Sequence, residues 1–332
     1  WALAYAHLGW TELVTTAEEL SRSGDRTEAR AAYEAALWRI REAPDASSAA
    51  GLVRWIARAW QVDSRHDEAL DCIAAAEAIA QVNGDRKGYG HALNVRAIVS
   101  WQRGDLDDAT RLYSQCLDIA LQESDTLLAA MASQNLGIIA TVRGEHEQAL
   151  QHYKASLEGY RTLGVQRDIY IVQNNLGRLY CDREQWEEAE EAFSAALDVA
   201  STLGAASHTT MIEINVAEMW VKRRDLDRAD EVCHRAIARA SSLHDSHADG
   251  EAYRVQGIIA RERRDFEAAE HAFARADEIA TKREDLLLQA HVERERAQLF
   301  RTQGRLHELL KSLTRARQLF SRLRAQRAVA DV

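Results

Sequence analysis

The sequence predicts an all-α protein built as a right-handed α-solenoid of about eight 40-residue helix-turn-helix repeats. Alanine recurs in steps of 40 residues from Ala29 to Ala269, and the period never slips by one residue. The chain of 332 residues contains one proline and no alternating Val/Ile-rich run, so strands are not expected. A single globular core of this length would be large, whereas a solenoid grows by adding units that contact only their neighbours.

The clearest copy of the repeat runs from Ala130 to Gly164. It reads as a helix over about residues 127–142, a tight turn at 143–145 and a second helix over about residues 146–162. With Ala130 as repeat position 1, small residues at positions 8, 20 and 27 alternate with bulky ones at position 24, as close helix packing requires. Position 8 holds Ala17, Ala57, Ala97, Gly137, Gly177, Ala217, Gly257 and Ala297, and position 24 holds Tyr33, Ile73, Tyr113, Tyr153, Phe193, Cys233, Phe273 and Leu313.

These residues resemble the tetratricopeptide repeat, which carries L-G-x-x-Y on its first helix and A-x-x-x-F on its second. The pattern is clearest from Leu176 to Tyr180 and from Ala189 to Phe193. This unit departs from the family in having 40 residues rather than 34 and in lacking its usual proline. The longer unit resembles the variant found in spindle-orientation scaffolds, kinesin light chains and bacterial regulators of the maltose-activator or quorum-peptide-receptor type. The resemblance implies a non-catalytic protein- or peptide-binding scaffold.

The repeats divide the chain into a solenoid over residues 1–304 and a terminal helix over residues 305–332. The apolar spacing of that helix is typical of a coiled-coil seam, and its charge is locally basic. It is either a cap over the last repeat or a connector into a downstream domain, and a homodimer through it is a further alternative. The repeats are expected at 10–49, 50–89, 90–129, 130–169, 170–209, 210–249 and 250–289, with the first helix of repeat eight at 290–304. The seam consists of Leu306, Leu309, Leu313, Ala316, Phe320 and Leu323.

Short turns join the two helices of each repeat. In Gly104-Asp105 and Gly144-Glu145 the glycine is expected to end one helix in a left-handed conformation, and the acid is expected to cap the next helix. Arg224-Asp225 and Arg264-Asp265 follow the pattern loosely. Repeat position 14 is arginine in five successive repeats, which we interpret as a favourable charge at a helix C-terminus; a basic stripe for a ligand is the alternative. The five are Arg103, Arg143, Arg183, Arg223 and Arg263.

Composition argues against several classes of function. The net charge of -10 disfavours binding to nucleic acid or to an anionic membrane, and no stretch approaches 18 uninterrupted apolar residues. Four cysteines without paired spacing are typical of reduced thiols in a cytoplasmic protein. His244 and His247 lie in a polar loop without further ligands, so no metal is expected. No phosphate loop or nucleophile motif is present, and neither cofactor nor catalysis is predicted. The chain begins at Trp1, without a methionine or a charged and then apolar leader sequence. We therefore expect a segment of a longer protein.

Repeat positions 2, 5, 6, 9, 12 and 13 of the first helices should line the concave groove. Position 6 is asparagine in three successive repeats, and its amide can both donate to and accept from a peptide backbone. Hydrogen bonds between neighbouring repeats are the alternative. We predict an extended peptide ligand with an acidic group and an apolar anchor; a regulatory or sensory arm of a larger bacterial protein is the alternative function. The candidate groove residues are Arg54, Trp55, Arg58, Asn94, Trp101, Gln134, Asn135, Asn174, Asn175, Arg178, Asn215, Arg254 and Arg294.

Overall fold

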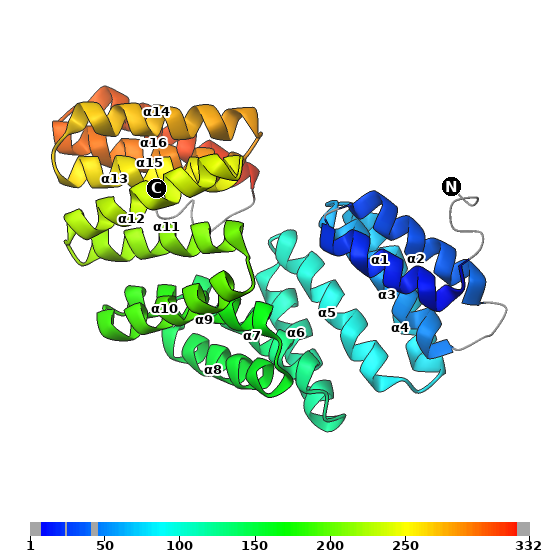
Figure 1. The fold of residues 1–332 in the computed structure, drawn as a ribbon. Helices are drawn as coiled ribbons and strands as arrows, with labels where there is room; N and C mark the ends of the chain where they lie inside the picture. The colour runs from blue at the N-terminus through cyan, green and yellow to red at the C-terminus, as the bar shows by residue number, and fades with distance from the viewer. Residues whose placement is uncertain (1–7, 24, 41–45, 324–332) are drawn as a thin grey trace. The chain divides into compact units, whose positions relative to one another are not determined.

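The computed structural model describes residues 8–23, 25–40 and 46–323. These residues form α-helices and no strand, which confirms an all-α solenoid of 40-residue helical hairpins (Figure 1). Within this part of the chain no helix is both long and apolar enough to cross a membrane. The helices are α1 (Trp10–Ser23), α2 (Arg26–Ile40), α3 (Ala46–Val62), α4 (His66–Val82), α5 (Arg86–Gln102), α6 (Leu106–Gln122), α7 (Thr126–Arg143), α8 (His146–Leu163), α9 (Gln166–Asp182), α10 (Trp186–Thr202), α11 (Ala206–Lys222), α12 (Leu226–Ser242), α13 (Ser246–Glu262), α14 (Phe266–Lys282), α15 (Leu286–Gln303) and α16 (Leu306–Arg322).

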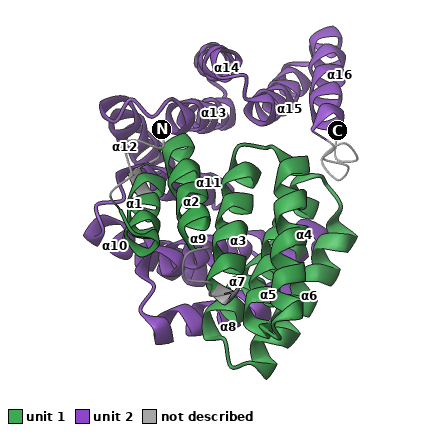
Figure 2. Ribbon diagram, turned by 90° about the vertical axis from the view of Figure 1, so that its right-hand side faces the viewer, with its two compact units in different colours: residues 1–139 green, residues 140–332 purple. Residues whose placement is uncertain are grey.

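The chain divides into two compact units (Figure 2). Unit 1 comprises Trp1–Ile139 and contains α1 to α6 with most of α7, whereas unit 2 comprises Ala140–Val332 and contains α8 to α16. Within each unit, a helix packs against its hairpin partner and against the first helix of the next repeat. Each unit is therefore a stack of hairpins whose apolar side chains are buried between neighbours.

Helix starts follow a strict spacing. From Arg26 to Leu306 every helix begins 20 residues after the preceding one. In the clearest repeat, α7 and α8 begin and end within one residue of the bounds expected from the sequence. The last helix, α16, ends at Arg322, and residues 324–332 of the longer terminal helix that we expected lie outside the described residues.

A left-handed residue ends the helices from α3 to α15 at the same interval. Gly104 and Gly144 have φ of 81° and 73°, as the sequence predicts, and Arg224 and Arg264 adopt the same conformation despite their side chains. The acid after the turn caps the next helix at Asp105, where the carboxylate accepts the Asp108 backbone N–H at 3.0 Å. Asp225 and Asp265 cap in the same way. Glu145 makes no such bond, so its predicted capping role is wrong; its side chain is one methylene longer than that of aspartate.

The packing positions behave as the sequence predicts. Ala189 and the other alanines at repeat position 20 are buried, and so are the bulky side chains at position 24 from Tyr33 to Phe273. A Cβ atom added to Gly177 would lie 2.6 Å from the Phe193 ring, and one added to Gly257 would lie 2.5 Å from Phe273. Glycine at position 8 therefore makes room for phenylalanine at position 24 of the same hairpin.

Candidate functional site

The candidate site is the face formed by repeat positions 2, 5, 6, 9, 12 and 13 of the first helices, here called the first-helix face. In unit 2, α9, α11, α13 and α15 contact one another in succession, and in unit 1 α3 contacts α5. This packing brings the same positions of consecutive repeats close together. The polar side chains of this face can therefore bind either a ligand or each other.

The asparagines of unit 2 differ in their partners. The Asn215 amide donates a hydrogen bond of 2.8 Å to the side-chain oxygen of Asn174 on the preceding first helix. For Asn215 the structure therefore agrees with the alternative of hydrogen bonds between neighbouring repeats. Asn175 is half-buried and makes no side-chain hydrogen bond to a described residue, and the same holds for Asn135 in unit 1. Bonding between repeats accounts for one of the three position-6 amides.

Arg254 is enclosed within unit 2 rather than presented to solvent. Its side chain is buried, with Nε donating to Glu251 at 2.7 Å and the guanidinium also paired with Glu218 on the preceding first helix. These two carboxylates raise the pKa of Arg254 despite its burial, and Arg254 lowers that of Glu218. Because both of its nearest acids come from the protein itself, Arg254 is not an available cation for a ligand.

Further ion pairs link consecutive first helices in unit 2. Lys222 donates to Asp182 at 2.8 Å, and Arg261 pairs with Glu295 at 2.7 Å. Arg294 lies 3.7 Å from the same Glu295. Arg178 is exposed and has no ion pair with a described residue. The face of unit 2 is therefore largely paired internally.

Unit 1 keeps an aromatic side chain open on the first-helix face. Trp55 is 40% exposed and stacks on Tyr33 with the ring centroids 5.9 Å apart and nearly parallel. The Arg54 guanidinium carbon lies 5.2 Å from the Trp55 ring centroid, within cation–π range. Burial lowers the pKa of Arg54, and the charges of Asp85 and Asp125 oppose this shift in part. The Arg54 side chain makes no hydrogen bond to a described residue. Arg54 and Trp55 thus combine a cation with an accessible apolar surface.

The remaining candidates of unit 1 are less accessible. Asn94 is buried, and its side-chain oxygen lacks a hydrogen-bond partner among the described residues. Trp101 is half-buried against the core around Leu93. Arg58 and Gln134 are also half-buried. The structure brings Trp55 and Arg54 into contact with each other and shows Asn94 and Trp101 mainly as packing residues.

His247, in the first turn of α13, takes part in pairing between repeats. His247 lies 3.4 Å from Asp285, which raises the pKa of the imidazole and lowers that of Asp285 to about 2. His244 occupies the left-handed turn position. In the described part of the chain no three His, Cys, Asp or Glu side chains form a metal-binding group. Burial raises the pKa of the Cys116 and Cys233 thiols to about 12, so neither is an activated nucleophile.

Four of the five arginines at repeat position 14 bind acids of the preceding repeat. Arg183 pairs with Glu147 at 2.8 Å, and Arg263 pairs with Asp227 and Asp230 at 2.8 and 2.7 Å. Arg103 and Arg223 likewise bind acids of the preceding second helix. The interpretation from the helix dipole alone is therefore incomplete. It considered only the helix that carries each arginine and not the acids of the preceding repeat.

An internal charge reversal supports the same conclusion. In repeat two, position 14 is Asp63, which binds Arg30 at position 21 of repeat one at 3.0 Å. Where position 14 is arginine, position 21 carries an acid in Glu190 and Asp230. This reversal, together with the acids at position 18, is the signal in the sequence that would have identified the pairing.

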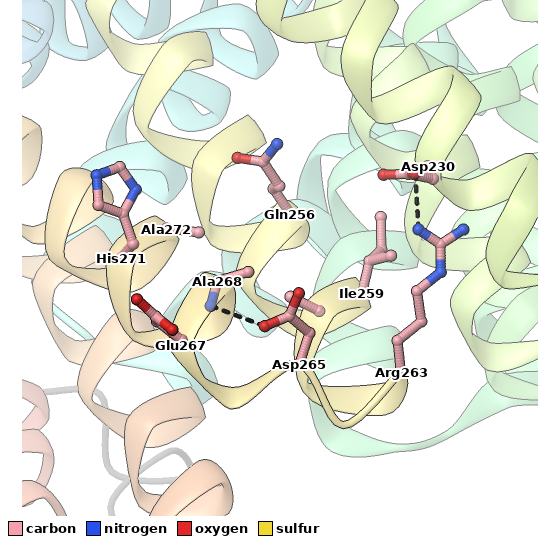
Figure 3. Close-up of a pocket in the computed structure, with 10 residues that line it drawn as sticks. Asp230, Gln256, Ile259, Arg263, Asp265, Glu267, Ala268, His271 and Ala272 are labelled. Carbon is pink, nitrogen blue, oxygen red and sulfur yellow. Dashed lines mark hydrogen bonds and ion pairs between the residues drawn. The ribbon is translucent and has the colours of Figure 1, made fainter.

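A cleft of about 540 Å³ lies among α12, α13 and α14 (Figure 3). Asp265 on its wall caps α14, and Asp230 binds Arg263, so both acids already have structural partners. Gln256, Glu267 and His271 complete its polar lining. The arrangement contains no nucleophile with an adjacent base, and no catalytic chemistry follows from it.

Comparison with known proteins extends these observations. Residues 91–162 and 125–202 match the tetratricopeptide repeat family. Over 108 residues the chain is 34% identical to the transcriptional activator NprA of Geobacillus stearothermophilus. This matched segment covers 32% of this chain and 27% of NprA. The chain thus spans about a quarter of the curated relative that it matches.

Two solved structures share the fold. A Rap protein complexed with competence and sporulation factor aligns with a TM-score of 0.65 and 16% identity, over 96% of this chain and 99% of that chain. A signal-transduction ATPase with numerous domains and a tetratricopeptide repeat sensor, from Pyrococcus horikoshii, aligns with a TM-score of 0.67 and 15% identity. That alignment covers 94% of this chain and 47% of the ATPase chain.

Proposed function

This chain is a tetratricopeptide-repeat protein, and we propose that it is a non-catalytic cytoplasmic scaffold that binds an extended peptide segment along its first helices. The observation that carries the proposal is the Arg54–Trp55 pair of unit 1, where an exposed ring lies beside a cation that has no hydrogen-bond partner among the described residues. Buried aromatic and arginine side chains dominate the energetics of many interfaces. An apolar residue of the peptide would cover Trp55, and a neighbouring carboxylate would bind Arg54.

An asparagine of unit 1 would support the peptide backbone. Asn135 keeps an amide without a hydrogen-bond partner in the described residues, whereas Asn215 of unit 2 is bonded to Asn174. A side-chain amide can donate to a peptide carbonyl and accept from a peptide N–H. The Rap protein complexed with competence and sporulation factor lends support by fold, because its partner is named in that complex.

A peptide-display library selected on residues 1–332 would test the proposal. We expect enriched sequences to combine an acidic residue with an apolar one, and Trp55→Ala to weaken the best peptide by about tenfold or more, equivalent to about 1.4 kcal/mol. Trp38, which is 59% exposed on α2, provides the matched control, and Trp38→Ala should leave affinity unchanged. Equal losses in both variants, or no enriched motif, would contradict the assignment.

The second candidate is a regulatory or sensory arm of a larger protein. The match to a transcriptional activator over part of its length and the fold shared with a tetratricopeptide repeat sensor both favour it. The two functions are compatible, because a sensor arm can itself bind the peptide. The sequence of the full-length gene would decide: a DNA-binding or nucleotide-binding domain in the same polypeptide would support the arm.

A further inference from the structure

The last helix, α16, has an apolar face that is exposed. In earlier second helices the equivalent face packs against another helix. Leu306 and Leu310 of α16 are 69% and 65% exposed, and Leu309 and Leu313 are only half-buried. The residues at the positions equivalent to Leu309 and Leu313 are buried in all earlier second helices. The first helix of the next repeat packs against second helices such as α12 and α14. These four leucines are here called the α16 stripe. They are apolar, like the residues of a helix surface that packs against another helix.

The first helix of the chain has the opposite character. Repeat positions 3 and 10 are apolar in every later first helix but are Glu12 and Glu19 in α1, and both are exposed. A polar outer face of this kind is typical of a solenoid cap. The α1 helix of a second copy would place carboxylates on the α16 stripe, so stacking of copies end to end is disfavoured.

Charge also disfavours two copies meeting through α16. The helix carries Lys311, Arg317 and Arg322, which are exposed and have no ion pair with a described residue. Arg315 of this helix binds Glu293, and Arg305, which precedes the helix, binds Glu270 and Glu308. Two antiparallel α16 helices would bring the unpaired cations of both copies together.

A following repeat with arginine at position 14 is a poor occupant as well. Earlier second helices offer an acid at position 18, such as Glu187 or Asp227, to the arginine of the next repeat. In α16 positions 18 and 21 are His307 and Leu310. A following first helix with arginine at position 14 would therefore find no carboxylate.

We propose that the α16 stripe docks an amphipathic helix of another protein, whose apolar side packs on Leu306, Leu310 and Leu313 and whose acidic flanks meet Lys311 and Arg317. The covered surface that all other repeats possess defines the shape of the site, and the unpaired cations define the charge of the partner. This surface is separate from the Arg54–Trp55 pair, so the inference does not rest on the proposed peptide site.

Two synthetic helical peptides of about five turns provide the test. Both carry leucine at i, i+3, i+4 and i+7, one with glutamate flanks and the other with lysine flanks. Fluorescence anisotropy with residues 1–332 should show the glutamate peptide binding about tenfold more tightly or better. Leu310→Glu should abolish that preference, whereas Leu121→Glu, at a leucine of α6 that is 67% exposed, should not change it. Lys311→Glu combined with Arg317→Glu should reverse the preference toward the lysine peptide.

Three outcomes would overturn the proposal. Equal binding of the two peptides would show only a non-specific apolar surface, and binding unaffected by Leu310→Glu would place the site elsewhere. A dimer in sedimentation velocity that Leu310→Glu dissociates would identify a second copy as the occupant. If Leu310→Glu lost its helical circular dichroism, the exposed charge variants would still decide the question. Trp55→Ala should leave peptide binding at α16 unchanged, which separates this site from the proposed groove.

Discussion

At the scale of single residues, the asparagines show why a repeated polar position has two meanings. The sequence identified the column at position 6 but could not tell a bond to a ligand from a bond to a neighbouring repeat. The deciding partner, Asn174, lies 41 residues before Asn215 at position 5 and is visible only once the two first helices are packed. The sequence therefore predicted which positions form the candidate site. It did not predict which of their side chains bind each other.

The amide pair gives a first prediction. Asn215→Ala and Asn174→Ala should each lower the free energy of unfolding by about 0.5–1.5 kcal/mol, because each breaks the same hydrogen bond, less a few tenths regained from the helix propensity of alanine. The double variant should lose less than the sum of the two. Urea unfolding measures all three. Asn175→Ala serves as the control and should not lose stability, since its amide has no partner in the described residues.

Glycine at position 8 gives a second prediction. Gly177→Ala should destabilise the protein by about 1–3 kcal/mol, because the added methyl group would overlap the Phe193 ring. In a Phe193→Cys background the same change should cost at least about 1 kcal/mol less, since repeat six combines Ala217 with Cys233. Thermal melts followed by circular dichroism provide the comparison.

A contrasting glycine controls for helix propensity. Gly51 lies within α3 with nothing within 4 Å of an added Cβ, so Gly51→Ala should stabilise by about 0.5–1 kcal/mol. A loss at Gly51 similar to the loss at Gly177 would show that backbone effects dominate rather than the contact with Phe193.

At the scale of elements, helix bounds were the most predictable feature. Turn residues and apolar spacing are local, so the bounds of α7 and α8 followed from their own residues. The links between elements were harder to predict. Arg263 ends one helix, yet its partners Asp227 and Asp230 belong to the hairpin before it, and no rule for a single helix brings them together.

The charge reversal in repeats one and two leads to a third prediction. Arg263→Asp or Asp230→Arg alone should lower stability by about 0.2–1 kcal/mol, the usual range for pairs near the surface. The double variant should recover part of the loss, because Asp63 and Arg30 already occupy these positions with the charges exchanged, whereas Asp227 would still face the new aspartate. A double-mutant cycle in low and high salt tests this, and the coupling should shrink as salt rises. A cycle without coupling would mean that the pair does not stabilise the interface between the repeats.

At the scale of the whole molecule, the unbroken period makes each repeat removable. Deleting residues 206–245, which contain α11 and α12, would leave Arg263 facing Glu187 and Glu190, acids at the same two positions as its present partners. We therefore expect a cooperative, helical protein with a lower melting temperature. Deleting 206–235 instead would break the spacing and should abolish cooperative unfolding.

A further substitution should restore stability to the same deletion variant. Arg254 would lose Glu218 and face Arg178, which holds the equivalent position 9 in repeat five. Adding Arg178→Glu to the deletion should restore about 1–3 kcal/mol, because a buried arginine regains a carboxylate. Differential scanning calorimetry measures the recovery. If Arg178→Glu changed the intact protein and the deletion variant equally, the position-by-position equivalence of the repeats would be wrong.

Position-14 arginines bind acids of the preceding repeat, and this affects the order in which the repeats fold during synthesis. Four of these arginines bind acids that were synthesised earlier, as Arg183 binds Glu147. Translation at about 5–20 residues per second delivers one 40-residue hairpin every few seconds, whereas a helix forms within about a microsecond. A hairpin that leaves the ribosome thus meets carboxylates already displayed by its predecessor. Assembly can then proceed in one direction, from the first hairpin to the last, with each finished hairpin serving as the template for the next.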